Sequence, residues 1–372
     1  MYRRSSYHNA MLANGCSTFK KYAHKDPFFG IDMFVPLAKA MQSGSMLATV
    51  EGLFTTYGKT FQSNSWATTV INTMDPLVTQ TVLANSPEKF DVAPSRRPKH
   101  REANLLWVKF SVIPSLEKHV NRLLELIPRD GSTIDLQPLL KSMLIPTKTV
   151  EKVSPTNYVY LDELVKKTKD KTELLNQMLN LFLPARDSTS SATGFIFFHL
   201  ARHPDVWMKL REEVVSVGAP ITFDLLKSMK YLNLRLLAPA GLSIRTCVED
   251  CVLSRGGGTD GKSPFLVPPG TEIRIVLQAL HEDRDIWGED AMEFGPERWE
   301  NLRTTRGYIP FLGGGRICPA QQMAPIEVFY LVVRSMQEFK VIENRDPEKK
   351  FVAGMKLSMG SENSVKVGFE VA

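Results

Sequence analysis

One cysteine stands in a Gly-rich loop near the end of the chain. The loop reads Phe311-Leu-Gly-Gly314-Gly-Arg316-Ile-Cys318-Pro-Ala320. A haem iron held by sulfur needs an anionic thiolate, its propionates need a cation, and backbone approaches the flat ring most easily at glycine, which has no Cβ. The loop therefore predicts a haem–thiolate site. For Cys318 alone, a buried free cysteine that packs as a small hydrophobe is the alternative.

The residues after Cys318 indicate how its thiolate is stabilised. Pro319 suits the first position of a helix, where its missing N–H costs nothing. Apolar residues then recur at helical spacing, namely Met323, Ile326, Tyr330 and Val333. A helix N-terminus at Cys318 stabilises a thiolate through its dipole and unpaired N–H groups. Pro325 lies inside this pattern and predicts a kink or a shortened helix.

A second group with chemical potential lies within a long helical pattern. Pro184-Ala-Arg-Asp187-Ser188-Thr189 places a carboxylate beside two hydroxyls, where a proline and a small residue loosen the helix. Such a group holds water and relays protons to a reacting oxygen. The alternative is that these side chains only cap or solvate the helix.

Together, the two groups resemble the cytochrome P450 superfamily, whose ligand loop has the spacing Phe-x-x-Gly-x-Arg-x-Cys-x-Ala. The resemblance implies haem b as cofactor, with Cys318 as the proximal iron ligand, Arg316 against a propionate and Phe311 shielding the sulfur near Gly314. It also places Asp187 and Ser188 at the proton-delivery positions, with Thr189 behind them.

Three further arginines follow from the same resemblance. Arg245 fits a second propionate contact, with a surface arginine as the alternative. Arg298, in Phe294-Gly-Pro-Glu-Arg-Trp299, resembles the arginine that locks the loop leading to the ligand cysteine. Arg235 occupies the arginine position of the family's Glu-x-x-Arg pair, but Leu232 stands where the glutamate belongs. A buried charge without its partner costs about 3–5 kcal/mol.

Four blocks of sequence look like the fungal alkane and fatty-acid hydroxylase branch of the family: Ala23–Pro27, Tyr158–Val165, Asp285–Gly288 and Ile317–Gln322. The resemblance implies a monooxygenase that inserts one oxygen atom of O2 into a long-chain alkane or fatty acid. Electrons come from NADPH through a reductase. It also implies the endoplasmic reticulum membrane as location and leaves a membrane surface open as a partner.

The match is interrupted at three places. Fragments remain of the family's Trp-x-x-x-Arg helix near residues 98–102, the chain jumps across the pocket-roofing helices near 144–157, and the glutamate before Arg235 is missing. We expect a degenerate gene or an imperfect gene model to account for these losses. The second functional hypothesis is therefore a non-catalytic remnant that binds haem weakly.

Two motifs favour a structural interpretation. Gly256–Ser263 satisfies the P-loop spacing, but Pro264 follows at once and a P-loop must open a helix, so we expect a hairpin loop. Cys247 and Cys251 resemble half of a metal site, yet no second Cys or His pair stands at zinc-like spacing.

Composition favours an ordinary globular protein. The chain has 372 residues, 43% of them hydrophobic and 23% charged, with a net charge of +6 spread along its length, so a nucleic-acid groove is not expected. Four cysteines argue against a disulfide framework. No stretch reaches 18 apolar residues, so no membrane anchor is expected in this chain.

The pattern along the chain predicts a mainly α fold with small β-sheets, a cytochrome P450 fold with internal losses. We expect a single domain over 1–372, with a small mixed α/β part at about 15–100 and a helical haem-binding part at about 105–372. Short helices at 36–60 and 74–90 flank strands near 60–62 and 68–71, another strand follows at 271–278, and 171–216 is long and helical. Expected core residues on that stretch are Leu175, Met178, Phe182, Phe195, Phe198 and Trp207.

Overall fold

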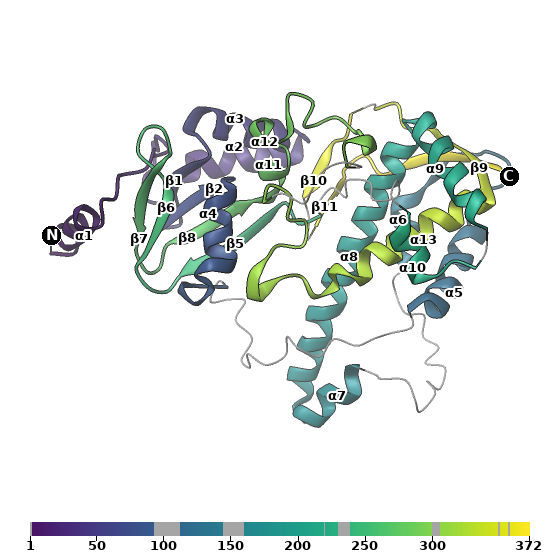
Figure 1. Ribbon diagram of the computed structural model, residues 1–372, viewed down its shortest axis with the longest axis horizontal. Helices are drawn as coiled ribbons and strands as arrows, with labels where there is room; N and C mark the ends of the chain where they lie inside the picture. The colour runs from purple at the N-terminus through teal and green to yellow at the C-terminus, as the bar shows by residue number, and fades with distance from the viewer. Residues whose placement is uncertain are drawn as a thin grey trace. The chain divides into compact units, whose positions relative to one another are not determined.

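The computed structural model describes residues 2–92, 112–143, 160–218, 220–229, 239–299, 306–348, 350–355 and 358–372. Two compact units are present (Figure 1). Unit 1 comprises Met1–Lys99, Ala240–Glu293 and Arg303–Cys318, and unit 2 comprises His100–Pro239, Phe294–Leu302 and Pro319–Ala372. Helices dominate and the sheets are small, which confirms the predicted fold class.

Unit 1 is built on a five-stranded sheet with the order β1-β2-β8-β5-β3 and a separate hairpin of β6 and β7. Its strands are β1 (Thr60–Ser65), β2 (Thr68–Thr73), β3 (Phe90–Asp91), β5 (Leu242–Cys247), β6 (Cys251–Gly257), β7 (Ser263–Val267) and β8 (Glu272–Val276). Its helices are α1 (Tyr2–Ala13), α2 (Ile31–Gln42), α3 (Met46–Tyr57), α4 (Pro76–Gln80), the π-helix η1 (Thr81–Asn85), the 3-10 helices η2 (Pro87–Lys89) and η6 (Gly314–Arg316), α11 (Leu277–His281) and α12 (Arg284–Trp287).

The hairpin of β1 and β2 follows from its two-residue turn. Ser65 pairs with Thr68, and Trp66 and Ala67 between them both have positive φ, 51° and 61°. Two consecutive positive φ values define the turn whose twist matches paired strands. β2 then pairs in parallel with β8, from Val70 opposite Glu272 to Thr73 opposite Ile275. The predicted strands near 60–62, 68–71 and 271–278 are therefore confirmed.

Unit 2 is mainly helical. Its helices are α5 (Val112–Glu125), α6 (Leu136–Met143), α7 (Tyr160–Lys167), α8 (Lys171–Leu200), α9 (Pro204–Val217), α10 (Phe223–Ser228), α13 (Met323–Glu338) and the 3-10 helices η5 (Pro296–Trp299) and η7 (Pro319–Gln321). Its strands are β4 (Ile134–Asp135), β9 (Phe339–Asn344), β10 (Ala353–Met355), β11 (Met359–Ser361) and β12 (Lys366–Val371). Helix α13 packs against α5, α8, α9 and α10, and this contact forms the core of the unit.

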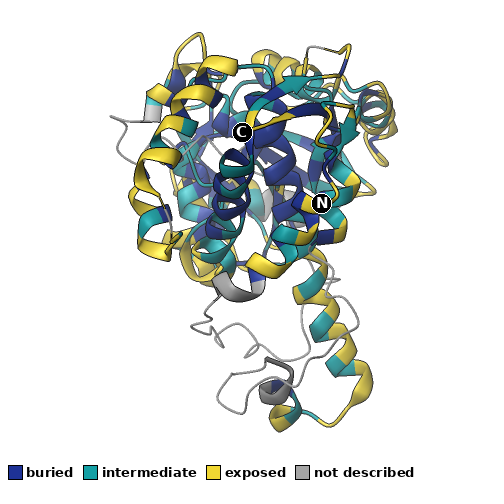
Figure 2. Ribbon diagram, turned by 90° about the vertical axis from the view of Figure 1, so that its right-hand side faces the viewer, coloured by how far each residue is buried: buried dark blue, intermediate teal, exposed yellow. Residues whose placement is uncertain are grey.

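Helix α8 is buried over only part of its length. Asp170 caps its start by accepting hydrogen bonds from the N–H groups of Thr172 and Glu173. The turns that follow are coloured as exposed or intermediate in Figure 2, whereas the last three turns are buried. Phe195, Phe198 and Trp207 lie in the core as predicted, but Leu175 is 59% exposed, so its predicted core position is wrong. Helical periodicity identifies an apolar face without revealing whether another element covers it.

The chain after Cys318 begins with a 3-10 turn rather than an α-helix. Pro319–Gln321 form η7, and α13 starts only at Met323. Pro325 therefore falls in the first turn of α13, where an N–H group has no helical partner to lose. The predicted shortening of the helix is confirmed, while the expected start directly after Cys318 is wrong.

Candidate functional site

The cysteine loop of unit 1 is closed by its own backbone. The N–H of Cys318 donates to the carbonyl of Phe311 at 2.8 Å, and the N–H of Ile317 donates to the carbonyl of Gly314 at 3.2 Å. The 3-10 turn η6 lies between these bonds. Cys318 is partly exposed, whereas Cys16, Cys247 and Cys251 are buried. These bonds thus fix the backbone that leads to the partly exposed thiol.

Glycine is required at position 314. Gly314 has φ +68°, and a Cβ there would overlap the backbone carbonyl of Leu83 in η1. Both the left-handed conformation and the close approach exclude an ordinary side chain. The cysteine loop is therefore held against η1 within unit 1, which the sequence pattern alone did not reveal.

Two arginines and one aspartate gather beside this loop. The Arg245 side chain on β5 is only 7% exposed, and its Nη1 donates to the Ser243 hydroxyl at 3.0 Å and to the Ile244 carbonyl at 2.9 Å. Burial lowers the pKa of Arg245, the positive charge of Arg316 lowers it further, and Asp91 acts in the opposite direction. Arg316 Nη2 lies 3.6 Å from Asp91 Oδ1.

This arrangement fits an anionic group. In the described part of the chain, the charged groups that act on Arg245 are one guanidinium, Arg316, and one carboxylate, Asp91, so two cations share a single anion. A bound carboxylate relieves the repulsion between two such arginines, and guanidinium is the preferred partner of carboxylates. Arg245 and Arg316, together with the partly exposed Cys318, fit a ligand that carries acidic side groups and needs a sulfur ligand.

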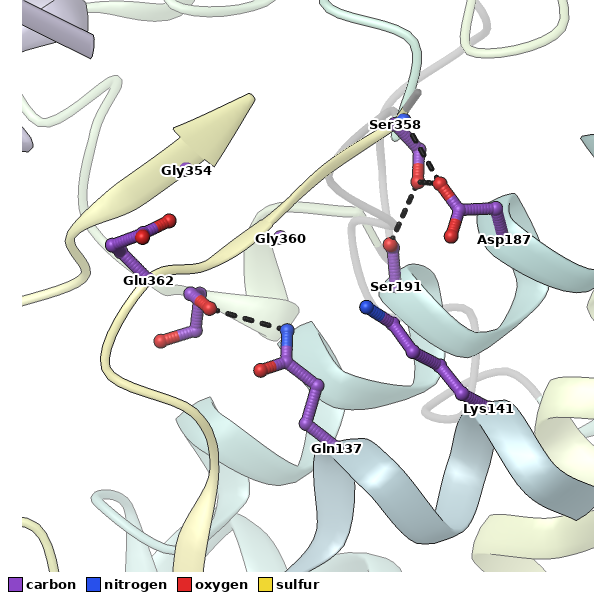
Figure 3. Close-up of a pocket in the computed structure, with 9 residues that line it drawn as sticks. Gln137, Lys141, Asp187, Ser191, Gly354, Ser358, Gly360 and Glu362 are labelled. Atoms are coloured by element: carbon purple, nitrogen blue, oxygen red, sulfur yellow. Dashed lines mark hydrogen bonds between the residues drawn. The ribbon is translucent and has the colours of Figure 1, made fainter. Parts of the chain in front are cut away.

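The predicted proton-delivery residues lie on α8 in unit 2, where Asp187 is bonded to the segment around β11 (Figure 3). Oδ2 of Asp187 accepts a hydrogen bond from the Ser358 hydroxyl at 2.6 Å and from the Ser358 N–H at 3.0 Å. Ser188 points back along the helix, where its hydroxyl donates to the Pro184 carbonyl at 2.7 Å. The two residues therefore have different partners although they are adjacent.

Thr189 is buried and faces α13. Its hydroxyl is hydrogen-bonded to the Glu327 carboxyl. Although part of Glu327 reaches the surface, desolvation of its carboxyl raises the pKa to about 7, and the bond to Thr189 acts in the opposite direction. A carboxyl with a pKa near neutral can exchange protons at physiological pH.

Of the two remaining predicted arginines, the structure describes only Arg298. Arg298 lies in η5, and its backbone N–H donates to the Gly295 carbonyl at 3.3 Å. Its expected role in fixing the loop before the cysteine stays a prediction. Arg235 lies outside the described residues, as do residues 98–102 and 144–157.

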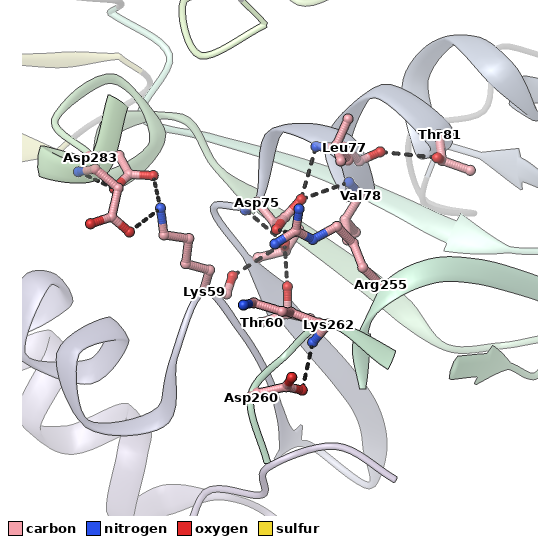
Figure 4. Close-up of polar contacts among 12 residues, drawn as sticks. Lys59, Thr60, Asp75, Leu77, Val78, Thr81, Arg255, Asp260, Lys262 and Asp283 are labelled. Atoms are coloured by element: carbon pink, nitrogen blue, oxygen red, sulfur yellow. Dashed lines mark hydrogen bonds and ion pairs between the residues drawn. The ribbon is translucent and has the colours of Figure 1, made fainter. Parts of the chain in front are cut away.

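The P-loop-like segment of unit 1 is a hairpin loop, as predicted. Strands β6 and β7 flank it, and the Gly256 N–H donates to the Gly261 carbonyl at 2.8 Å. Figure 4 shows the backbone N–H of Lys262 bonded to Asp260, and Arg255 beside Asp75. Nε of Arg255 lies 3.1 Å from Oδ2 of Asp75. Because a strand rather than a helix follows, the loop lacks the helix N-terminus that binds phosphate in a P-loop.

The sequence pattern of the cytochrome P450 family matches residues 141–366. That span includes the Asp187 segment, Arg245 and the cysteine loop described above. The chain belongs to the cytochrome P450 family, haem-iron monooxygenases that use O2 and take electrons from a redox partner.

Several fungal relatives are similar over most of the chain. Cytochrome P450 monooxygenase apdE of Emericella nidulans is 29% identical, with 95% of this chain and 89% of that protein covered. Cytochrome P450 monooxygenase fumoA of Cordyceps fumosorosea is 30% identical, with 96% and 92% covered. Cytochrome P450 52A3-A of Candida maltosa is 41% identical over 54% of this chain and 41% of that protein. The apdE alignment spans 463 positions against 372 residues here, so that relative has internal segments that this chain lacks.

Sequence reasoning missed three of these residues. Asp91 follows a short strand and Ser358 lies in a Ser- and Gly-containing segment, so neither has a distinctive local pattern. Glu327 did leave a signal, since it is a charged residue between Ile326 and Val328 in a helix whose neighbouring positions are apolar. A buried carboxylate at such a position needs a partner, and Thr189 provides it.

Among the residues that the structure describes, none of the helices has both the length and the apolar composition needed to cross a bilayer.

Proposed function

We propose that this cytochrome P450 binds haem b and inserts one oxygen atom of O2 into a long-chain alkane or fatty acid, with electrons passed from NADPH by a reductase. The observation that carries the proposal is that two like charges, Arg245 and Arg316, lie close enough to repel each other, two residues before the partly exposed Cys318 in the case of Arg316. Residues 1–372 are proposed to act as one catalytic domain at the endoplasmic reticulum membrane. The four sequence blocks typical of the alkane and fatty-acid hydroxylase branch support the choice of substrate.

In this proposal each residue of unit 1 has a separate task. Cys318 is the thiolate ligand, Arg316 and Arg245 hold the two propionates, Phe311 covers the sulfur and Gly314 allows the loop to lie close to η1. When bound, the haem iron supplies the electron-transfer and dioxygen chemistry. The protein supplies the ligand, the cations and the backbone that fixes them.

On α8, the proposed task of Asp187, Ser188 and Thr189 is to hold and deliver protons. Asp187 carries the proton, because its carboxylate is kept at a fixed position by the two hydrogen bonds that it accepts. Ser188 passes a proton onward once its hydroxyl turns from the Pro184 carbonyl. Thr189 holds α8 against α13 through its hydrogen bond to Glu327. Positioned proton transfer contributes about 100- to 10,000-fold to a rate.

The second candidate is a non-catalytic remnant that binds haem weakly. The internal segments present in the apdE relative and absent here favour it. Both candidates retain the cysteine loop and bind haem. They differ in turnover, because only the monooxygenase forms product.

The test is the carbon monoxide difference spectrum of the reduced, haem-loaded chain. A red-shifted band of the thiolate type is expected for the wild type and for Cys247→Ser, the control, and is lost in Cys318→Ala. Wild-type protein without that band would overturn haem–thiolate binding. With the band present, fatty-acid hydroxylation that falls at least 10-fold in Asp187→Asn supports the monooxygenase, whereas a band without any turnover supports the remnant.

A further inference from the structure

A polar pocket of about 280 Å³, including its mouth, adjoins Asp187 within unit 2 (Figure 3). Its walls come from α6, α8, β10 and residues 358–362, and they include Lys141, Asp187, Ser191, Ser358, Ser361 and Glu362. Charged and hydroxyl groups dominate this lining. Such a surface favours water over apolar ligands.

The pocket is connected to the carboxylate by a chain of hydroxyls. Ser191 Oγ lies 2.9 Å from Ser358 Oγ, which lies 2.6 Å from Asp187 Oδ2. A serine hydroxyl has a single hydrogen, and Ser358 gives its hydrogen to the carboxylate, which can only accept. Ser191 must therefore be the donor to Ser358. The chain has one direction, from Ser191 through Ser358 to Asp187.

One hydroxyl on the pocket wall indicates water in this pocket. The Ser361 side chain is 8% exposed, and its Oγ has no hydrogen-bond partner among the described residues. Buried hydroxyl groups are nearly always hydrogen-bonded, to protein or to ordered water. The several polar groups of the pocket wall provide the two to four partners that an ordered water requires.

We infer that Ser191 and Ser358 conduct protons from water in this pocket to Asp187. This inference rests on the proposed role of Asp187 as the proton-delivering acid. A pocket water gives one proton to Ser191 Oγ and regains a proton from bulk solvent. Ser191 passes its own proton to Ser358, and Ser358 passes its proton to Asp187 Oδ2. Each hydroxyl ends with one proton. The net change is one proton moved from solvent to the carboxylate, without oxidation or reduction.

Ser358 also positions the acid. Its N–H donates to the same Oδ2 at 3.0 Å, so the carboxylate stays in place while the hydroxyl hydrogen moves. Ser358 is therefore a positioning residue as well as a relay. Alanine at this position removes the hydroxyl and keeps the N–H, which separates the relay from the anchor.

The test compares Ser358→Ala and Ser191→Ala with Ser358→Thr and with Ser190→Ala as the matched control. Ser190 is buried on the same helix, but its hydroxyl donates to the Asp187 carbonyl at 3.0 Å and is not part of the pocket wall. We expect product formed per NADPH to fall about 10-fold or more in the two relay variants. In the same two variants, KM should equal that of the wild type, and the solvent isotope effect on turnover should be larger. The carbon monoxide band should be unchanged. Ser358→Thr should restore coupling, and Ser190→Ala should resemble the wild type.

A second measurement does not need activity. Amide hydrogen exchange at Ser358 in the haem-free chain should be slow and should accelerate in Asp187→Ala, but not in Ser190→Ala. Unchanged exchange, or an active enzyme whose coupling is unaffected by both relay variants, would overturn the relay. A wild type with the carbon monoxide band and altered exchange, but without turnover, would overturn the proposed function and the relay role with it, and would leave only the hydrogen-bonded contact.

Discussion

The Thr189 hydroxyl on α8 is hydrogen-bonded to the Glu327 carboxyl on α13, which desolvation has given a pKa of about 7. Two helices of unit 2 are thus joined by a group that titrates near neutral pH. The acid is more easily protonated in the folded chain than in the unfolded chain, where its pKa is about 4.5.

Stability should therefore fall as the pH rises. Between pH 4.5 and 7 the folded chain retains a proton on Glu327 that the unfolded chain has lost, so this group lowers the free energy of unfolding by about 2–3 kcal/mol over that interval. Urea unfolding at pH 5 and pH 8 measures the fall. Glu327→Gln should reduce it, whereas Glu338→Gln, on the same helix and paired with Arg129, should leave it in place. An equal fall in both variants would contradict the assignment.

The arginines beside the cysteine loop should control retention of an anionic ligand. Arg316→Gln and Arg245→Gln each remove one of two cations, so haem should transfer to an acceptor protein about 10-fold faster, equivalent to about 1.4 kcal/mol. Arg255→Gln is the control, since Arg255 pairs with Asp75 elsewhere in unit 1. Transfer rates that do not differ from the control would show that the cations do not bind the ligand.

The cysteine loop itself gives a matched pair of glycine variants. Gly314→Ala introduces a Cβ against the Leu83 carbonyl at a φ of +68° and should destabilise the chain by about 1–3 kcal/mol. Gly313→Ala meets no atom within 4 Å and should cost less than about 1 kcal/mol. Thermal unfolding of both variants without haem measures the difference. Similar costs would mean that the loop does not lie against η1.

Cys247 should resist alkylation. Burial raises the pKa of its thiol to about 12, and the thiol donates to the Glu249 carbonyl at 2.8 Å. At pH 8 its thiolate fraction is then about a thousandfold below that of a thiol with pKa 9. Iodoacetamide followed by peptide mapping should leave Cys247 unmodified in the native chain and label it in guanidinium. Rapid native labelling would show that the thiol is not buried.

The sequence predicted those parts of the fold that depend on local patterns. The strands at 60–73 alternate, and the turn at Trp66 and Ala67 joins them directly. Phe195 and Trp207 were placed correctly in the core because their helices are covered by other elements. Leu175 was placed wrongly because its apolar face has the same spacing but remains exposed.

The residues of the candidate site likewise fall into those that a local pattern reveals and those that it does not. Cys318, Gly314 and Arg316 lie within five residues of one another, so their pattern is readable along the chain. The electrostatic interaction of Arg245 with Arg316 acts between residues 71 positions apart. The hydrogen bonds of Asp187 with Ser358 and of Thr189 with Glu327 join residues 171 and 138 positions apart. Spacing in the sequence carries no information about such pairs, because tertiary folding alone brings them together.

The parallel pairing of β2 with β8 has a consequence for synthesis on the ribosome. Val70 pairs with Glu272, so the sheet of unit 1 cannot close until some 200 further residues have been made. At about 5–20 residues per second the emerging β2 waits about 10–40 s with an unpaired edge. During that interval the helices α5 to α10 emerge and can begin to fold. A chain terminated before residue 272 would leave the β8-facing edge of β2 permanently unpaired, and we expect such a product to aggregate.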